Sequence, residues 1–488
     1  MRKILAVGII LLFIGGSVVS GFQIHTSHQS LNRGWLYVGG DGPGNYTSIQ
    51  SAINDANPGD TIFVYDDSSP YYEGITVNKA LNLIGENKNT TVIDAGGNGD
   101  VIKISADGVC VEGFTLQNSG EFWQMAGVDI VANCSLITNN NIKDCCDGIN
   151  IYKNRFNNIL SENSISSTQL NGIGLWYSSN NNSILNNTIH SNKGDGIQLF
   201  CCQENKIIGN TLSSNNQGIY LSRSNTTFIS DNLLDSNVNN GILVSGTLNI
   251  VCNNTFFNDG IFVSVSITET NDIVNNTVNN KSLVYLDHVS DKVISIQAGQ
   301  IILVYCENIT IQNQELTHTS IGIQLEGSDN CVIVDNCLAD NRYGIHLHGY
   351  DHHIMSNTIL NNSNGLYCIT QRTNIEGNLI ANNEYGIDLI GWNNTIKNNI
   401  ISENKYGLHV EFGSNNNIMF NNFLNNSRNA GFSVFSGDRI NNWTDNYWER
   451  PRIFPKLILG KMRLGNSRVN IPWINFDWHP LQEPYDIP

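Results

Sequence analysis

The clearest pattern in the chain is a glycine followed by an apolar residue, any residue and another apolar residue, which returns every 21 to 24 residues. It forms two runs, headed by Gly127, Gly148, Gly172, Gly196, Gly218 and Gly241, and by Gly322, Gly344, Gly365, Gly386, Gly407 and Gly431. An asparagine column keeps the same period: Asn163, Asn187, Asn210, Asn232, Asn254, Asn276, Asn336, Asn357, Asn378, Asn399 and Asn421. Two independent markers with one period indicate a repeat protein.

Each repeat contains short strands of apolar and polar alternation, separated by Asn, Gly and Ser turns, and lacks an amphipathic stretch long enough for a helix. A period near 22 residues is typical of one coil of a parallel β-helix, whose rungs hydrogen-bond about 4.8 Å apart. The asparagines would then stack in a ladder, where an amide satisfies the turn backbone and the next rung. The sequence therefore predicts an all-β solenoid of about 14 to 16 rungs, roughly 70 Å long.

The two ends and the interruption between the runs predict the domain organisation. The segment from Tyr46 to Ala56 is typical of a short amphipathic helix, and such a cap covers the apolar cross-section and strand edge at the open end of a coil. We expect a signal peptide at 1–21, an N-terminal cap with the helix at 22–60, rungs at 61–278, an irregular insertion at 279–314, rungs at 315–440, and a nonrepetitive, aromatic-rich cap at 441–488.

With these features the chain resembles the right-handed parallel β-helix proteins of the pectin-lyase-like superfamily. Within it, the chain resembles the exported NosD-type periplasmic copper-processing proteins and the carbohydrate-binding CASH-type repeat proteins. The resemblance covers most of the chain, including the segment from Tyr46 to Val64, the interruption from Asn279 to Gln314 and the tail from Asn446 to Pro480. It implies a right-handed coil, but a shared coil does not by itself define a function.

The amino terminus predicts export. Arg2 and Lys3 precede an apolar run from Ile4 to Ile14 and small residues with a plausible cleavage point after Ser20 or Gly21. The alternative is an uncleaved anchor, which would be the only contact with a membrane. We therefore expect a secreted or cell-surface protein. Eleven cysteines are an odd number, so at least one is unpaired, and packing residues are favoured over a disulfide framework.

The composition limits the classes of partner that the protein is expected to bind. Charged residues make up 14% of the chain, against about 25% in typical proteins, and 26 Lys and Arg stand against 43 Asp and Glu. This acidic balance argues against a nucleic-acid partner. Asn-x-Ser/Thr triplets, such as those at Asn45 and Asn442, would accept N-linked glycans in a host that attaches them.

Candidate glycan-binding residues follow from the alternation within the strand after each repeat glycine, where positions two and four later point outward. Four after the glycine stand Tyr152, Trp176 and Phe200 on consecutive rungs, and two after it stand polar residues. The polar candidates are Asp129, Asn150 and Gln198. Aromatic faces beside amides and a carboxylate suit sugar rings, since apolar C–H faces stack while hydroxyls find partners. The structural alternative is that a loop or the tail covers these rings.

Candidate metal ligands lie in the second run. The column two after the glycine reads Gln324, His346, Tyr367, Asp388 and His409, with Glu326, His348 and Glu411 two positions further along. His346 and His348 point to the same side and could share Cu(II) or Zn(II), and His409 is a third candidate. His352 falls where asparagine stands in other rungs, so we expect it to substitute in a ladder. The sequence leaves copper and calcium as the possible cofactors.

For catalysis the strongest acids are Asp147 and Asp195, which precede their repeat glycines two rungs apart. That spacing gives roughly 9 to 10 Å, near the upper end of the separation in inverting glycosidases. Acids at this position are also common turn residues. We therefore expect a noncatalytic protein that binds a polysaccharide or cell-surface glycan, or builds a surface layer. The alternatives are a polysaccharide hydrolase or lyase and a NosD-like copper-handling accessory protein.

Overall fold

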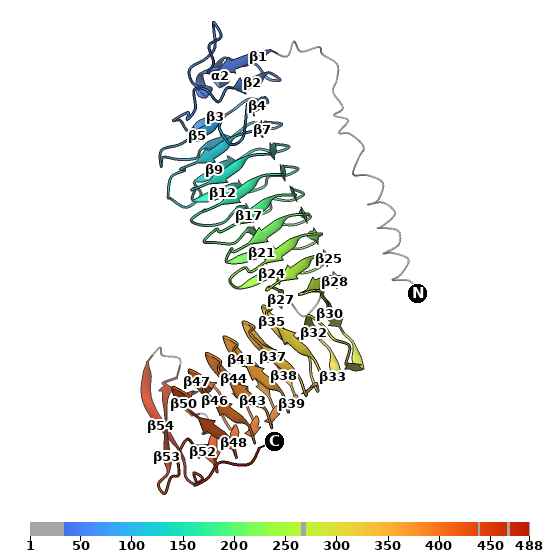
Figure 1. The fold of residues 1–488 in the computed structure, drawn as a ribbon, viewed down its shortest axis with the longest axis vertical. Helices are drawn as coiled ribbons and strands as arrows, with labels where there is room; N and C mark the ends of the chain where they lie inside the picture. Colours follow the sequence, from blue (N-terminus) through green and yellow to red (C-terminus); the bar gives the residue numbers. More distant parts are fainter. Residues whose placement is uncertain (1–33, 265–269, 438–439, 466–468, 488) are drawn as a thin grey trace.

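The computed structural model describes residues 34–264, 270–437, 440–465 and 469–487. It confirms the all-β prediction: the chain forms a parallel β-solenoid of about 18 turns, somewhat more than the sequence suggested, with one α-helix among the described residues. Figure 1 shows two stacks of coils that meet at a bend, the first coloured blue to green and the second yellow to red. The expected signal peptide lies outside the described residues.

The first stack has three faces, each a ladder of parallel strands. Face A contains β1 (Trp35–Val38), β2 (Thr61–Val64), β4 (Asn82–Gly85), β7 (Cys110–Glu112), β10 (Leu136–Thr138), β13 (Ile159–Ser161), β16 (Ser183–Leu185), β19 (Lys206–Ile208), β22 (Phe228–Ser230), β25 (Ile250–Cys252) and β28 (Asp272–Val274). Face B contains β5 (Val92–Asp94), β8 (Thr115–Gln117), β11 (Asn141–Lys143), β14 (Ser164–Ser166), β17 (Thr188–His190), β20 (Thr211–Ser213), β23 (Leu233–Asp235), β26 (Thr255–Phe257) and β29 (Thr277–Val278). Face C contains β3 (Ile75–Val77), β6 (Ile102–Ile104), β9 (Ala126–Ile130), β12 (Asp147–Tyr152), β15 (Ile173–Trp176), β18 (Ile197–Phe200), β21 (Gln217–Ser222), β24 (Asn240–Ser245) and β27 (Ile261–Ser264).

The second stack repeats this plan. Face D contains β30 (Lys281–Asp287), β32 (Gln300–Val304), β35 (Ile321–Glu326), β38 (Tyr343–Tyr350), β41 (Asn364–Gln371), β44 (Tyr385–Trp392), β47 (Tyr406–Glu411), β50 (Arg428–Phe435) and β53 (Lys456–Arg463). Face E contains β31 (Ser290–Ile294), β33 (Glu307–Gln312), β36 (Val332–Val334), β39 (His353–Met355), β42 (Asn374–Glu376), β45 (Thr395–Lys397), β48 (Asn417–Met419), β51 (Asn442–Thr444) and β54 (Asn470–Asp477). Face F contains β34 (Glu315–Thr317), β37 (Cys337–Ala339), β40 (Thr358–Leu360), β43 (Leu379–Ala381), β46 (Ile400–Ser402), β49 (Asn422–Leu424) and β52 (Tyr447–Trp448).

Buried asparagines connect the rungs. The backbone N–H of Asn187 donates to Asn210 Oδ1 at 2.9 Å, and Asn187 Nδ2 donates both to the Leu160 carbonyl and to the same Asn210 oxygen. The predicted column repeats this arrangement from Asn163 to Asn276 and from Asn336 to Asn421. Each side-chain amide thus satisfies a backbone N–H and a backbone carbonyl of the preceding rung and donates to the asparagine of the next rung, which confirms the ladder predicted from the sequence.

The ends of the solenoid are covered. Helix α2 (Ile49–Asp55) buries Ile49, Ala52 and Ile53 against the first coil, as predicted, and Ser48 accepts a hydrogen bond from the Ser51 backbone at its N-terminus. At the other end the indole ring of Trp448 stacks on Phe423 with centroids 4.4 Å apart, and its Nε1 donates to Asp477. The aromatic tail therefore closes the apolar core of the second stack.

The bend lies where β29 pairs antiparallel with β30, which reverses the chain. Residues 279–314, expected to be irregular, contain strands β30 to β33, which pair in parallel as the first coils of the second stack. Among the described strands, only β24 pairs with β27. At its other edge, Gln300 accepts from the Ile261 N–H and donates to its carbonyl, and Gln324 does the same for Val263. Two glutamine amides thus replace a strand at this edge.

No disulfide joins the cysteines in the described part of the chain. All eleven lie in the described part of the chain, all are free, and six of them are buried. Burial raises the pKa of the Cys331 thiol to about 11, so this thiol stays protonated and unreactive at neutral pH.

Candidate functional site

The predicted aromatic column lies on face C. Tyr152 is paired with Trp176 and Trp176 with Phe200 on consecutive strands, and the rings of Trp176 and Phe200 lie 6.3 Å apart. All three side chains are half-buried. The register expected from the repeat is therefore correct, and the rings lie at the surface.

Two further aromatic residues complete this surface, and the repeat pattern did not indicate them. The Tyr177 ring meets the edges of Tyr152 at 5.6 Å and Phe200 at 5.2 Å. Trp123, from the loop before β9, meets Tyr152 at 6.3 Å and is 60% exposed. We define the aromatic surface as Trp123, Tyr152, Trp176, Tyr177 and Phe200. The signal that could have found Tyr177 is its place directly after the aromatic column.

The polar flank differs from the expectation. Asp129 and Asn150 are buried and bonded to each other at 3.2 Å, and Lys103 holds the second oxygen of Asp129 at 3.0 Å. These two side chains are therefore buried and paired with neighbouring side chains instead of standing open at the surface. Gln198 remains half-buried at the surface. The Trp176 ring lies over Gly174, where an added Cβ would fall 2.7 Å from Nε1, so glycine at this position is what lets the indole lie flat.

The three histidines proposed as metal ligands do not come together. His346 packs among Phe262, Tyr343 and Tyr367, with ring centroids 5.1 to 5.5 Å away. This burial lowers the pKa of His346 to about 4. Its neighbour His348 is half-exposed and bonds Glu326 at 3.2 Å, an interaction that raises the pKa of His348. His346 is therefore a packing residue beside the bend, and His348 belongs to an ion pair.

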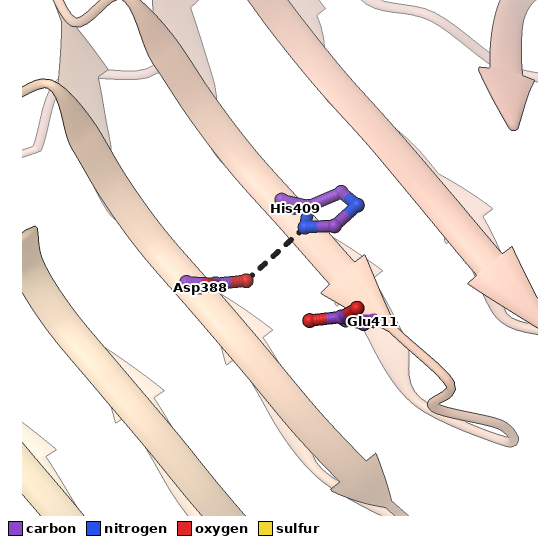
Figure 2. A group of neighbouring side chains, drawn as sticks. All are labelled: Asp388, His409 and Glu411. Carbon is purple, nitrogen blue, oxygen red and sulfur yellow. Dashed lines mark hydrogen bonds and ion pairs between the residues drawn. The ribbon is translucent and has the colours of Figure 1, made fainter. Parts of the chain in front are cut away.

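His409 instead forms a cluster with two acids. Asp388 lies on β44 and His409 and Glu411 on the neighbouring β47, and the three side chains project to the same side (Figure 2). His409 Nδ1 lies 3.1 Å from Asp388 Oδ1, and one ligand atom from each residue lies within 4.8 Å of the others. All three are half-buried. Asp388 and Glu411 were members of the polar columns, but the sequence did not single them out.

The donor set of this cluster is one imidazole and two carboxylates, which suits a divalent ion such as Cu(II) or Zn(II). Ligand atoms of a tetrahedral site, each at 2.0–2.2 Å from the ion, lie about 3.3 Å apart, so the side chains would have to turn inward to close on one. The cluster contains no sulfur, the donor that Cu(I) prefers. It also offers too few oxygens for calcium, which takes six to eight.

A small hollow adjoins His409. It has a volume of about 170 Å³ and is lined by Tyr385, Tyr406, His409 and Arg428, together with Leu408 and Gly431. The two tyrosine rings stack with centroids 4.8 Å apart. The cluster therefore lies at an accessible place on face D.

The two candidate catalytic acids have structural roles, because their carboxyl groups hydrogen-bond to the neighbouring rung. Asp147 accepts a hydrogen bond from the Asn171 backbone, and Asp195 accepts from Asn216 and from the Gln217 backbone. Both are buried, which raises the pKa of Asp147 to about 6 and raises that of Asp195. Each carboxyl joins its own turn to the next rung, as a turn residue does.

The stacked coils and their asparagine ladders define this chain as a parallel β-solenoid repeat protein. Within that class it belongs to the NosD family, because the family model described as "Periplasmic copper-binding protein (NosD)" matches residues 53–240, 203–293 and 285–466. The chain matches no curated protein sequence. Among the described residues, no helix combines the length and the apolar character needed to cross a membrane.

Several solved structures are similar to this chain. The A-module of the Azotobacter vinelandii mannuronan C-5 epimerase AlgE4 is 14% identical, with 78% of this chain and 92% of that chain covered and a TM-score of 0.31. An alginate lyase from Paenibacillus sp. str. FPU-7 is 11% identical, with 63% and 95% covered and a TM-score of 0.36. The Agl-KA catalytic domain is 14% identical, with 66% and 64% covered and a TM-score of 0.41.

Proposed function

We propose that this protein is an exported, noncatalytic glycan-binding protein whose binding site is the aromatic surface. The observation that carries the proposal is the contiguous set of five rings on face C, from Trp123 through Tyr152 to Phe200. A row of rings one rung apart offers repeated stacking positions to the apolar faces of a sugar chain.

The polar groups support binding without cleavage. Asp147 and Asp195 are each buried and hydrogen-bonded to the next turn, so neither is free to protonate a glycosidic oxygen or to activate water, the two roles that glycoside hydrolysis requires. Gln198 remains as a hydrogen-bonding side chain beside the rings. The family description, which places NosD proteins in the periplasm, supports a location outside the cytoplasm.

The test is a glycan-panel binding assay on the full chain and on Trp176→Ala. Loss of one stacking ring is expected to weaken binding by about two- to tenfold. The matched control is Trp392→Ala, which removes a surface indole from the second stack and should leave affinity unchanged. Unaltered binding by Trp176→Ala, or equal loss in both variants, would contradict the proposal. Shortened polysaccharide after incubation would contradict the noncatalytic part.

A second function is favoured by the cluster of Asp388, His409 and Glu411 together with the copper named in the family description. Copper(II), when bound there, would supply a Lewis acid or a redox centre at the surface of face D. In the chain itself, Asp388 orients His409 through the hydrogen bond to Nδ1, and a partner at one ring nitrogen sets which nitrogen is free to bind a metal.

Isothermal titration with Cu(II) and the paramagnetic spectrum of the loaded chain test this second function. We expect one copper site per chain and a paramagnetic signal that shows coupling to nitrogen. The nitrogen coupling should disappear in His409→Ala, and the affinity for copper should fall about 10- to 100-fold in Asp388→Asn. The control is His318→Ala, which removes an exposed imidazole from another face. An unchanged signal in His409→Ala would show that copper binds elsewhere.

A further inference from the structure

The basic residues of the chain are unevenly distributed. Residues 450–476 contain six of the 26 Lys and Arg and none of the 43 Asp and Glu. The rest of the chain therefore has 20 basic against 43 acidic residues. This segment includes β53 and all of β54 except its last residue, the buried Asp477, so one end of an acidic molecule carries a local excess of basic residues.

The same hairpin exposes apolar side chains. In β53 the side chains alternate: Ile458 is buried in the core of the second stack, whereas Leu457 and Leu459 are exposed. Across the hairpin Leu459 is paired with Ile474, which is also exposed. One face of the hairpin thus closes the solenoid, and the other presents aliphatic residues to solvent.

The segments flanking the hairpin extend this apolar face. Ile453 and Phe454, just before β53, are 87% and 80% exposed. Trp478, just after β54, is exposed and lies against Phe476 with ring centroids 4.9 Å apart. Figure 1 shows the hairpin at the far end of the second stack, away from the bend. We call this patch the hairpin face: Ile453, Phe454, Leu457, Leu459, Ile474, Phe476 and Trp478.

We propose that the hairpin face binds the surface of an anionic lipid bilayer. Apolar and indole side chains enter the boundary between headgroups and acyl chains, and neighbouring cations attract anionic headgroups. Lys461 is exposed two positions after Leu459 on β53 and therefore on the same face, and Arg450 is exposed three residues before Ile453. The contact is additional to the N-terminal apolar run, the only membrane contact expected from the sequence.

A bilayer fits this face better than a second copy of the chain. A two-fold contact brings the same patch of both subunits together, and here it would place two sets of basic residues opposite each other, which is unfavourable. An exposed apolar patch of this kind marks an interaction surface, and the six basic residues of 450–476, against the flanking acids Glu449 and buried Asp477, match an anionic partner.

The experiment is cosedimentation of the full chain with vesicles of phosphatidylcholine alone and with 30% phosphatidylglycerol. We expect binding to the anionic vesicles that falls with added salt. Arg450→Gln/Lys461→Gln should weaken it by about fivefold for each charge removed, and Phe454→Ser/Leu459→Ser by about tenfold or more. The control Val238→Ser/Ile296→Ser changes side chains that are 74% and 85% exposed far from the hairpin in sequence and should bind like the unmodified chain.

Three results would overturn the proposal. One is absence of binding to the anionic vesicles. Another is binding that is equal for both lipid compositions and for all variants, because the N-terminal run present in every variant would then account for it. The third is a dimer in solution that Phe454→Ser/Leu459→Ser dissociates, which would make the hairpin face a contact between copies. Because the charge variant leaves the apolar residues in place, misfolding of the serine variant would not remove the test. Brominated lipid should also quench the tryptophan fluorescence of the unmodified chain, and it should quench that of Trp478→Phe less.

Discussion

Replacement of His352 by asparagine should make the protein more resistant to acid. His352 is fully buried and takes the place that Asn394 and Asn416 hold in later rungs of the same ladder. Its Nδ1 accepts the Cys331 backbone N–H at 3.2 Å, which confirms the substitution expected from the sequence, but its Nε2 meets no partner of good hydrogen-bond geometry. An asparagine Oδ1 would accept the same N–H without a group that takes up a proton.

The magnitude follows from the pKa of the imidazole. Burial lowers the pKa of His352 to about 4 from an ordinary value near 6.5. At pH 8 the ring is neutral in both states. As the pH falls below 6.5, the unfolded chain binds a proton that the folded chain refuses, so stability is lost until about pH 4. At pH 5 the difference is about 1.5 pH units, or about 2 kcal/mol.

Guanidinium unfolding of the native chain and of His352→Asn at pH 8 and pH 5 measures this difference. We expect the two proteins to lie within about 1 kcal/mol of each other at pH 8, with the variant gaining about 2 kcal/mol relative to the native chain at pH 5. Amide exchange at Cys331 gives a local readout, since long repeat arrays can unfold in parts. His353→Asn, at the exposed neighbouring imidazole, is the control. A stability difference that is the same at both pH values would refute the reasoning.

Three further predictions concern the ladders and the bend. Asp259 ends a ladder by accepting hydrogen bonds from Asn237, and burial raises the pKa of Asp259 to about 7. Because a carboxyl with a raised pKa makes the folded protein less stable as the pH rises from about 4 to 7, Asp259→Asn should stabilise the protein by about 2 to 3 kcal/mol more at pH 8 than at pH 5. An equal gain at both pH values would contradict this. Asn210→Ala leaves the Asn187 N–H and the Ile184 carbonyl without partners and should cost about 3 kcal/mol in urea unfolding, against almost nothing for Asn54→Ala on the exposed side of α2. Gln300→Ala/Gln324→Ala exposes the edge of β27 and should lower the thermal midpoint and speed amide exchange at Ile261 and Val263, whereas half-exposed Gln371→Ala should not.

The fold was accessible from the sequence because a solenoid repeats one local rule. Inward residues, turn asparagines and repeat glycines recur at one period, so each rung is evidence for the others. The column positions are therefore correct to the residue, as the pairing of Asp388 with His409 shows. The interruption was harder, because a single antiparallel reversal at Val278 and Lys281 ends one stack and starts the next, and an event that occurs once has no period.

The candidate site was accessible only in part, for two physical reasons. Trp123 lies in a loop outside the repeat, so nothing in the pattern places it against Tyr152. Outward direction also does not ensure exposure: Asp129 points away from the core, but Lys103 and Asn150 on neighbouring rungs enclose it. A repeat predicts the strand position and the direction of a side chain, but it does not predict which neighbouring side chains contact or cover it.

The rung spacing determines which polar side chains can bind one metal ion together. His346 and His409 belong to the same column, but Tyr367 and Asp388 stand between them, so the two imidazoles start three rungs, or about 14 Å, apart. No pair of histidine side chains closes that distance around one ion. Ligands in a parallel solenoid must come from adjacent rungs or from positions two apart on one strand, and Asp388, His409 and Glu411 satisfy both conditions. This condition places His409 with Asp388 and Glu411 and separates it from His346 and His348, which lie three rungs away.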